Sequence, residues 1–391
     1  MSLALFVFAV TLAAPAYIYF GYPALIYLVS RLRPRPFRPA GDTGEPTATL
    51  LVPVYNEETV IEGKIANTLA LDYPPDRLET LVVSDGSTDA TEAIVRGFSL
   101  QAGDRVRLLA IPRSGKAFAL NEGARAARGE ILVLTDANTL LEPGSLRPLV
   151  DPFADPGVGG VCGNKKQRPP AGADTTAEGE NLYWRWDKWQ KALESRAGSI
   201  FAADGTLYAV RKELYVPIAD PAQADDIAIS ARVVLQGRRL LYEPRAVAWE
   251  EAPAEGRDEF RRKVRVTNHS VRALWNLGRG LWTSGFYSVE LLSHKFFRHL
   301  VPFFLIPLFL SNTVLAAGGS PVFRLLFAGQ VLFYGLALAG FALRGTRLGK
   351  AKPFTVPYYF CLVNAAAFLG VLSILRGRRL RAWTPRSGLS S

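Results

Sequence analysis

Cysteine is scarce in this chain. Its 391 residues include two cysteines, Cys162 and Cys361, which stand in unrelated contexts. This count excludes a disulfide framework, and no cysteine spacing typical of a zinc site is present. No internal repeat, low-complexity run or nucleic-acid motif stands out. The net charge of +11 therefore fits anionic lipid and phosphate-bearing substrates, and nucleic acid is not a predicted partner.

Charged side chains are missing altogether from residues 3–29. A bilayer core needs about 20 apolar residues, so residues 1–30 are predicted to form a transmembrane anchor. The stretch is too long for a signal peptide and lacks a basic start and a convincing cleavage site. A basic linker, residues 31–47, follows, and its four arginines in RLRPRPFR place that flank in the cytoplasm. The amino terminus is then outside and the middle of the chain is cytoplasmic.

Residues 48–257 are predicted to form an α/β domain. Apolar strand-like runs alternate with helix-like stretches, which favours a mostly parallel sheet with helices on both faces. The strand-like runs are residues 47–54, 78–85, 105–111, 130–136 and 158–164, with a further one at 206–211. The helix-like stretches include residues 57–72, 116–129 and an aromatic-rich segment at 177–197.

Three acidic positions carry most of the functional signal. Asp85 and Asp136 directly follow buried strand-like runs, and open α/β sheets bind ligands beyond the carboxyl ends of their strands. The third position is the pair Asp225 and Asp226 at a helix start. Neighbouring residues on a helix point in different directions, so one carboxylate can face a site while the other caps or pairs. These acids predict a metal–phosphate substrate and a base, although each could instead shape a turn or cap a helix.

The residues around Asp136 suit a metal and a phosphate. Asp136 and Asn138 offer two oxygen ligands at i and i+2, which with substrate phosphates suit Mg²⁺ or Mn²⁺. Lys116 follows a glycine at a helix start, where anions are favoured. The alternatives are a turn aspartate followed by a capping asparagine, and a solvated lysine.

Two loops complete the candidate site. Tyr55 and Glu57 occupy a strand-to-helix turn, where an aromatic ring and polar groups can hold a nucleobase; ordinary helix capping is the alternative. Asp204 and Gly205 precede the strand-like run TLYAVR. A glycine-containing loop lets a substrate approach the backbone closely, and a plain hairpin turn is the alternative.

Helices beyond the sheet are predicted to meet the membrane. Trp184 lies in the aromatic helix 177–197, which either packs on the sheet or meets the membrane interface or an acceptor. Residues 258–299 mix basic and apolar side chains and predict interfacial amphipathic helices. Arg262 and Arg265 share one helix face and suit a diphosphate, or form part of a basic membrane-surface helix.

The carboxy-terminal part, residues 300–376, is predicted to hold transmembrane segments, with a basic tail at 377–391. The apolar segments are residues 300–317, 321–343 and 354–375, with a tight GGSP turn between the first two. Three full spans would place the basic tail outside, against the positive-inside tendency. The last segment, which contains Pro357 and Asn364, is therefore the candidate for a re-entrant or incomplete span.

The order of these motifs resembles a known family. VYNEE, SDGSTD, SGKAFALN, TDAN, ADGTLYAVR, ADD and RRKVR are similar to the motifs of membrane-bound family 2 glycosyltransferases, which are related to bacterial polysaccharide synthases. The resemblance covers residues 48–270 and implies an α/β GT-A domain joined to α-helical transmembrane segments. In two places the chain departs from the family pattern: Asn138 replaces the second acid of the metal motif, and Arg262 and Val266 replace the Gln and Trp of the processive-synthase signature.

The resemblance implies a role for each candidate residue. Asp226 is the general base, and Asp136 with Asn138 holds the metal, Mg²⁺ or Mn²⁺. The residues assigned to the nucleotide-sugar are Tyr55, Glu57, Asp85, Lys116, Asp136, Arg262 and Arg265. Those assigned to the acceptor are Asp204, Gly205, Asp225 and Trp184.

The implied enzyme is an inverting hexosyl- or N-acetylhexosaminyltransferase of a bacterial inner membrane with a cytoplasmic catalytic domain. It would use a UDP-sugar to form β-linkages in an extracellular polysaccharide, with possible export partners. Transfer of a single sugar to a polyprenyl-linked acceptor is the close alternative. An inactive scaffold that only binds nucleotide-sugar is the alternative from another class. The motifs do not fix the sugar, the acceptor, processivity or the oligomeric state.

Overall fold

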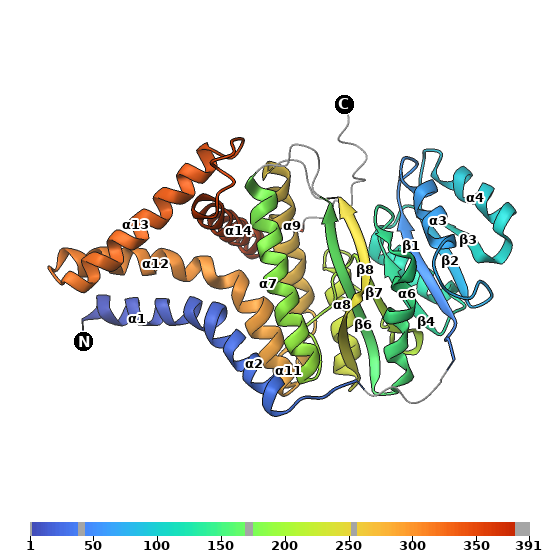
Figure 1. The fold of residues 1–391 in the computed structure, drawn as a ribbon, viewed down its shortest axis with the longest axis horizontal. Coiled ribbons are helices and arrows are strands. Elements are labelled where there is room, and N and C mark those ends of the chain that lie inside the picture. Colours follow the sequence, from blue (N-terminus) through green and yellow to red (C-terminus); the bar gives the residue numbers. More distant parts are fainter. Residues whose placement is uncertain (1, 38–43, 169–174, 252–255, 380–391) are drawn as a thin grey trace.

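The structure, a computed structural model, describes residues 2–37, 44–168, 175–251 and 256–379. A sheet with flanking helices forms one side of the molecule, and long apolar helices extend from the other (Figure 1). The helices α7 and α9 stand between these two parts. Most of the basic tail, residues 380–391, lies outside the described residues.

One eight-stranded sheet in the order β3-β2-β1-β4-β7-β6-β8-β5 builds the α/β part. Its strands are β1 (Ala48–Val54), β2 (Leu78–Asp85), β3 (Val106–Ile111), β4 (Ile131–Thr135), β5 (Leu140–Leu141), β6 (Val158–Arg168), β7 (Leu207–Arg211) and β8 (Arg239–Glu251). β1 pairs in parallel with β2 and β4, and β2 pairs in parallel with β3. β7 is antiparallel to both β4 and β6. The carboxyl ends of β1, β2 and β4 therefore share one edge, as predicted.

β8 was not among the predicted strands. Its apolar run is interrupted by Glu243, Pro244 and Arg245, which hides the period-two pattern on which strand prediction depends. The parallel pairing with β6 is correspondingly irregular, because the register shifts between Cys162 and Asn164. Proline removes a ladder donor, and a bulge lets the two strands stay paired on both sides of it.

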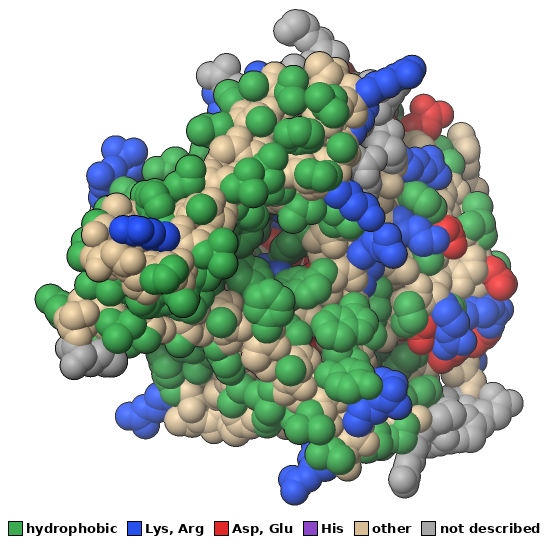
Figure 2. Space-filling model, turned by 60° about the vertical axis from the view of Figure 1, so that its left-hand side comes forward, with side chains coloured by type: hydrophobic (Ala, Val, Ile, Leu, Met, Phe, Trp, Pro, Cys, Tyr) green, Lys and Arg blue, Asp and Glu red, His purple; other side chains and the backbone are tan. Residues whose placement is uncertain are grey.

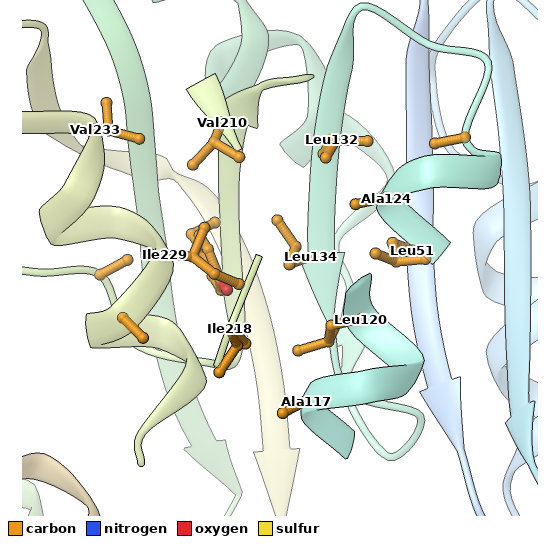
Figure 3. Packing of buried hydrophobic residues seen from close by; sticks show 14 of the residues in the cluster. Leu51, Ala117, Leu120, Ala124, Leu132, Leu134, Val210, Ile218, Ile229 and Val233 are labelled. Carbon is orange, nitrogen blue, oxygen red and sulfur yellow. The ribbon is translucent and has the colours of Figure 1, made fainter. Parts of the chain in front are cut away.

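Alternating side chains build separate cores on the two faces of the sheet. On β1, Leu51 packs into one core, whereas Leu50 and Val52 face the other side. Two helices, α5 (Lys116–Ala126) and α8 (Asp225–Leu235), cover the face of Leu51 (Figure 3). The other face is covered by α3 (Ile61–Leu69), α4 (Thr91–Ala102) and α6 (Leu146–Val150). α5 and α8 start at the edge where the strands end, so their first residues reach the site.

Among the residues that the structure describes, four helical segments are long and apolar enough to cross a membrane: Leu3–Leu32, Phe286–Ala317, Pro321–Ala342 and Lys352–Leu375. The first comprises α1 (Leu3–Ala16), a π-helical turn and α2 (Tyr22–Leu32), and the second comprises α11 (Phe286–Glu290), a π-helical turn and α12 (Phe297–Ala317). The third and fourth are α13 and α14. Many of their apolar side chains are exposed, for example Phe20 and Leu325, as expected for surfaces that contact lipid.

α14 is tied to the α/β part of the molecule by α9 (Gly256–Trp275). Gly370 of α14 lies so close to Thr267 of α9 that an added Cβ would be 2.6 Å from the threonine Cβ. The amide of Asn268 donates to Ser373 Oγ at 2.7 Å. α14 is seen almost end-on in Figure 1, whereas α1 and α12 lie in the plane of the view. That this segment does not fully cross a membrane stays a prediction.

Candidate functional site

A cavity of about 1480 Å³ lies where the sheet edge meets α7 (Thr175–Ala197), α9 and the apolar helices. Most of the predicted site residues line it, from segments that are far apart in the sequence. They are Glu57, Lys116, Asp136, Asn138, Trp184, Asp204, Gly205, Asp225, Asp226, Arg262 and Arg265. Tyr55 and Asp85 are the two predicted residues that are not part of its lining.

Asp85 holds a loop beside the cavity. At the end of β2 it is fully buried and accepts hydrogen bonds from the backbone N–H groups of Ser114 at 2.6 Å and Gly115 at 2.9 Å. It also forms an ion pair with Arg113. The positive φ of Gly86, 68°, and the 2.8 Å between a Cβ at that position and Arg113 N explain why glycine stands there. Asp85 thus positions the 113–115 loop, and its direct contact with a nucleoside stays a prediction.

Arg113 is a site residue that the sequence did not reveal. Its guanidinium lies 3.5 Å from the centroid of the Tyr55 ring, and Arg113 lines the cavity. A guanidinium stacked on an aromatic ring presents a flat, cationic surface, which suits a nucleobase or a phosphate. Because Arg113 stands in a loop, no helical or strand periodicity marks it.

The first two strand-to-helix turns are joined by hydrogen bonds between their motifs. The backbone N–H of Glu57 donates to Thr91 Oγ1 at 2.8 Å, and that of Thr88 donates to Asn56 Oδ1 at 2.8 Å. Asn56 takes a positive φ of 51°, which asparagine tolerates better than most residues. The polar residues of the two motifs therefore fix the shape of this edge, and Glu57 faces the cavity from it.

Lys116 brings two of the acidic positions together. Its Nζ lies 2.9 Å from Asp136 Oδ1 and 3.0 Å from Asp225 Oδ2. Burial alone would lower the pKa of Lys116, but the two carboxylates raise it well above its ordinary value. The ammonium of Lys116 therefore stays protonated between Asp136 and Asp225. Its positive charge faces the cavity in which a substrate would bind.

The residues around Asp136 fit a divalent metal that shares its ligands with a substrate. Among the described residues, no group of three or more His, Cys, Asp and Glu converges on a metal position. Asp136 and Asn138 both face the cavity, and their carboxylate and amide oxygens are donors of the kind that a hard divalent cation prefers. Mg²⁺ is typically held by one or two carboxylates, waters and substrate phosphates, so this small donor set suits it.

Lys64 supports the turn that carries Asp136 and Asn138. It is fully buried, and its Nζ donates to Thr139 O at 2.6 Å and Thr135 Oγ1 at 3.1 Å. Burial lowers the pKa of Lys64 to about 7. The sequence contained a signal for this role, since Lys64 shares the buried face of α3 with Ile61, Ile65 and Thr68. A lysine on an apolar helix face needs a partner inside the protein.

Asp226 faces the cavity from the first turn of α8. Burial and the neighbouring carboxylate of Asp225 raise the pKa of Asp226 to about 6, because burial disfavours a charged carboxylate and Asp225 repels a second negative charge. Its Oδ1 accepts a hydrogen bond from the backbone N–H of Ile227 at 2.8 Å. Gly205 lies opposite, where an added Cβ would be 3.9 Å from Asp226 Oδ2. The two acids of the pair thus diverge as predicted: Asp225 pairs with Lys116 and Asp226 faces the Asp204–Gly205 loop.

Asp204 is anchored on α7. Lys191 Nζ lies 3.1 Å from Asp204 Oδ2 and 3.4 Å from Asp187 Oδ2. Burial would lower the pKa of Lys191, but these two carboxylates raise it well above its usual range. The network fixes the loop that faces Asp226 and ties it to the helix that borders the apolar part of the cavity.

Arg262 is engaged by carboxylates of α7 and α9. Its Nε donates to Glu259 Oε2 at 2.7 Å, and its Nη2 pairs with Glu180. Burial opposes ionisation of Glu180, but Arg262 and Lys263 lower its pKa to about 2. The indole of Trp184 also donates to Glu180, at 3.1 Å. A diphosphate on Arg262 would have to compete with these carboxylates, so this contact stays a prediction, as does acceptor contact by Trp184.

Comparison with known proteins identifies the family of the α/β domain. Residues 49–216 match the profile described as glycosyl transferase family 2. The α/β domain belongs to glycosyl transferase family 2. The family resemblance and the GT-A fold expected from the motifs are confirmed.

Similar proteins come from bacteria and archaea. The poly-beta-1,6-N-acetyl-D-glucosamine synthase of Staphylococcus aureus (strain COL) is 28% identical over 224 residues, covering 56% of this chain and 53% of the synthase. The probable glycosyltransferase YdaM of Bacillus subtilis (strain 168) is 30% identical over 237 residues, covering 56% and 54%. The chain thus spans about half the length of these curated relatives.

A solved structure covers almost the whole chain. The mannosyltransferase PcManGT from Pyrobaculum calidifontis, in complex with GDP-Man and Mn²⁺, has a TM-score of 0.70 and 27% identity. The match covers 95% of this chain and 99% of that structure. The likeness therefore includes the apolar helices as well as the family 2 domain.

Proposed function

We propose that this family 2 glycosyltransferase transfers a sugar from a nucleotide-sugar to an acceptor hydroxyl at a membrane surface, with inversion at the anomeric carbon. The observation that carries the proposal is the convergence of Asp136, Lys116 and Asp226 on one cavity that continues between the apolar helices. A base, a cationic phosphate site and a membrane-facing opening are the parts that such a transfer requires.

In the proposed reaction, Asp226 accepts the proton of the acceptor hydroxyl as that oxygen attacks the anomeric carbon. The bond from this carbon to the diphosphate breaks, and the nucleoside diphosphate leaves with the electron pair. Lys116 stabilises the charge that develops on the leaving group. Bound at Asp136 and Asn138, Mg²⁺ or Mn²⁺ would supply further neutralisation of that charge. A single displacement turns an α-linked donor into a β-linked product.

The donor is proposed to be a UDP-sugar that carries a hexose or an N-acetylhexosamine. The name of the staphylococcal relative, an N-acetylglucosamine polymer synthase, supports a hexosamine. GDP-Man in the archaeal mannosyltransferase supports testing guanosine donors as well. The aromatic and guanidinium pair of Tyr55 and Arg113 gives a stacking surface that either base could use.

Two kinds of acceptor fit this proposal. The staphylococcal relative supports a growing extracellular polysaccharide, with export partners. The apolar walls of the cavity favour a single transfer to a lipid-linked saccharide instead. In both cases the catalytic domain is proposed to be cytoplasmic at a bacterial inner membrane, where nucleotide-sugars are made. A donor-binding scaffold without activity is less favoured, because the acids expected of a metal site and a base both face the cavity.

A panel of nucleotide-sugars tests this proposal directly. We expect the purified full-length protein in lipid to release nucleoside diphosphate from one UDP- or GDP-sugar in the presence of Mn²⁺ and membrane extract. Mass analysis of the product then distinguishes a ladder of lengths from a single added sugar. If no donor is turned over under any of these conditions while nucleotide still binds, the scaffold alternative replaces the enzyme.

The pH dependence offers a second test. A base works in its deprotonated form, so kcat/KM is expected to fall as the pH drops through about 6, the pKa of Asp226. Asp225→Asn removes a neighbouring negative charge and is expected to move this acidic limb to lower pH. The measurement is the pH profile of donor turnover for both proteins. An acidic limb that stays in place in the variant would mean that another group titrates.

A further inference from the structure

The cavity does not end at the catalytic acids. It continues between α1, α12, α13 and α14, where its walls are apolar and include Leu12, Leu308, Leu326, Phe333 and Val363. Figure 2 faces these helices and shows a hollow among hydrophobic side chains, with charged atoms visible at its floor. Such walls offer nothing to a polar sugar polymer but suit a hydrocarbon chain.

A group of basic side chains lies between these walls and the catalytic acids. Lys295, Arg298 and His299 all line the cavity, at the start of α12 and in the π-helical turn before it. Residues spaced by three or four on a helix share one face. Asp226 lines the same cavity. The basic group and the proposed base therefore face one continuous space.

Arg298 and His299 have buried nitrogen atoms without hydrogen-bond partners. Within the part of the chain that the structure describes, these atoms are Arg298 Nη1 and Nη2 and His299 Nε2. The Arg298 side chain is 10% exposed, and its nearest carboxylate oxygen, Asp187 Oδ1, is 3.7 Å from Nη1. That oxygen is already 3.2 Å from His294 Nε2. The guanidinium otherwise lies over the rings of Trp186 and Tyr183, at 4.6 and 4.9 Å.

Buried donors without acceptors are costly, and a buried guanidinium most often meets a carboxylate or a phosphate. A phosphate would supply oxygen acceptors to Arg298 and His299 and negative charge to Lys295. A phosphate at this position could link a polar acceptor group near Asp226 to a hydrocarbon chain that lies between the apolar walls.

We infer that Lys295, Arg298 and His299 bind the phosphate or diphosphate of an isoprenoid-type lipid that carries the acceptor saccharide. The inference rests on the proposed function and names its acceptor class. The saccharide hydroxyl faces Asp226, the phosphate oxygens accept from Arg298 and His299, and the hydrocarbon chain lies between α12, α13 and α14. No bond to the phosphate changes in this arrangement, so the site acts by binding alone.

Binding of farnesyl diphosphate, farnesol and inorganic diphosphate tests the inference. The full-length protein in nanodiscs is first saturated with nucleoside diphosphate and Mn²⁺, which fills the donor site, and affinities are measured by calorimetry. We expect farnesyl diphosphate to bind at least about tenfold more tightly than either of its parts. Equal affinity for farnesol would overturn the phosphate contact, and equal affinity for inorganic diphosphate would overturn the role of the chain.

Substitutions at Arg298 test whether this residue contributes to the binding of farnesyl diphosphate. Arg298→Gln is expected to weaken the binding of farnesyl diphosphate by about tenfold or more and to leave the affinity for the nucleotide unchanged. Arg298→Lys keeps the positive charge and the aliphatic stem, so it should retain part of the affinity even if the glutamine variant folds poorly. Arg279→Gln is the matched control, because Arg279 is exposed and lies off the cavity. Unchanged affinity in both Arg298 variants would overturn the inference.

Donor turnover in the same preparation separates this inference from the proposed function. Turnover with another acceptor, combined with no binding of farnesyl diphosphate, would overturn the lipid-phosphate site and leave the glycosyltransferase reaction standing. Binding of farnesyl diphosphate that depends on Arg298, in a protein that turns over no donor, would support the site and count against the reaction.

Discussion

Asp226→Asn is expected to lower the rate of sugar transfer by about 100- to 10,000-fold, the usual contribution of a general base. Asparagine has the same shape as aspartate, and its Oδ1 can still accept from the N–H of Ile227, as Asp226 does at 2.8 Å. The turn at the start of α8 therefore keeps its geometry. What is lost is the ability to take the acceptor proton, together with one negative charge beside Asp225.

Donor binding distinguishes loss of the base from loss of the site. Nucleoside diphosphate release gives the rate, and calorimetry with the nucleotide gives the affinity, which is expected to change little because Lys116 and Asp136 are intact. Asp76→Asn is a matched control, since Asp76 is exposed and does not line the cavity. Wild-type turnover in the Asp226 variant would remove Asp226 as the base.

Asp136→Ala is expected to weaken Mn²⁺-dependent nucleotide binding by about 10- to 100-fold, the scale of a charge-assisted contact. Two effects combine in this variant. A carboxylate ligand is lost beside Asn138, which carries no charge, and Lys116 is left with Asp225 alone, 3.0 Å away. The ammonium is then drawn away from the position where phosphates are proposed to bind.

Nucleotide affinity measured with Mn²⁺ and again with EDTA isolates the metal contribution. In the wild type the nucleotide affinity should be higher with Mn²⁺ than with EDTA. In Asp136→Ala the two affinities should be nearly equal. Asn138→Ala is the companion variant, with a smaller expected loss because an amide oxygen binds a hard cation less strongly than a carboxylate. Full wild-type activity and nucleotide affinity in EDTA would show that the metal assignment is wrong.

Much of the α/β domain could be predicted because its signals are local. Buried strands appear as short apolar runs, and Asp85 and Asp136 stand where those runs end. β8 was not predicted because Glu243, Pro244 and Arg245 interrupt its apolar pattern. The apolar helices were equally visible, since a membrane segment is defined by length and composition alone. The order of the motifs was enough to indicate the family.

The partners of each side chain depended on contacts between distant segments. Lys116 was expected to approach phosphates, but its contacts with Asp136 and Asp225 arise only when α5, β4 and α8 meet at one edge. Asp85 turned towards the 113–115 loop, and Arg262 towards Glu180 on α7. Periodicity reports which face of an element is buried, but not which element covers that face.

The sequence by itself determined the family, the sheet edge that carries the acids, and the apolar segments, because motifs and hydropathy are properties of neighbouring residues. Only the tertiary structure decided that Lys64 holds the Asp136 turn, that Arg113 stacks on Tyr55, and that the buried Arg298 nitrogens Nη1 and Nη2 have no hydrogen-bond partner. Each of these depends on desolvation and on partners from remote parts of the chain, which exist only once the helices have packed against the sheet and against one another.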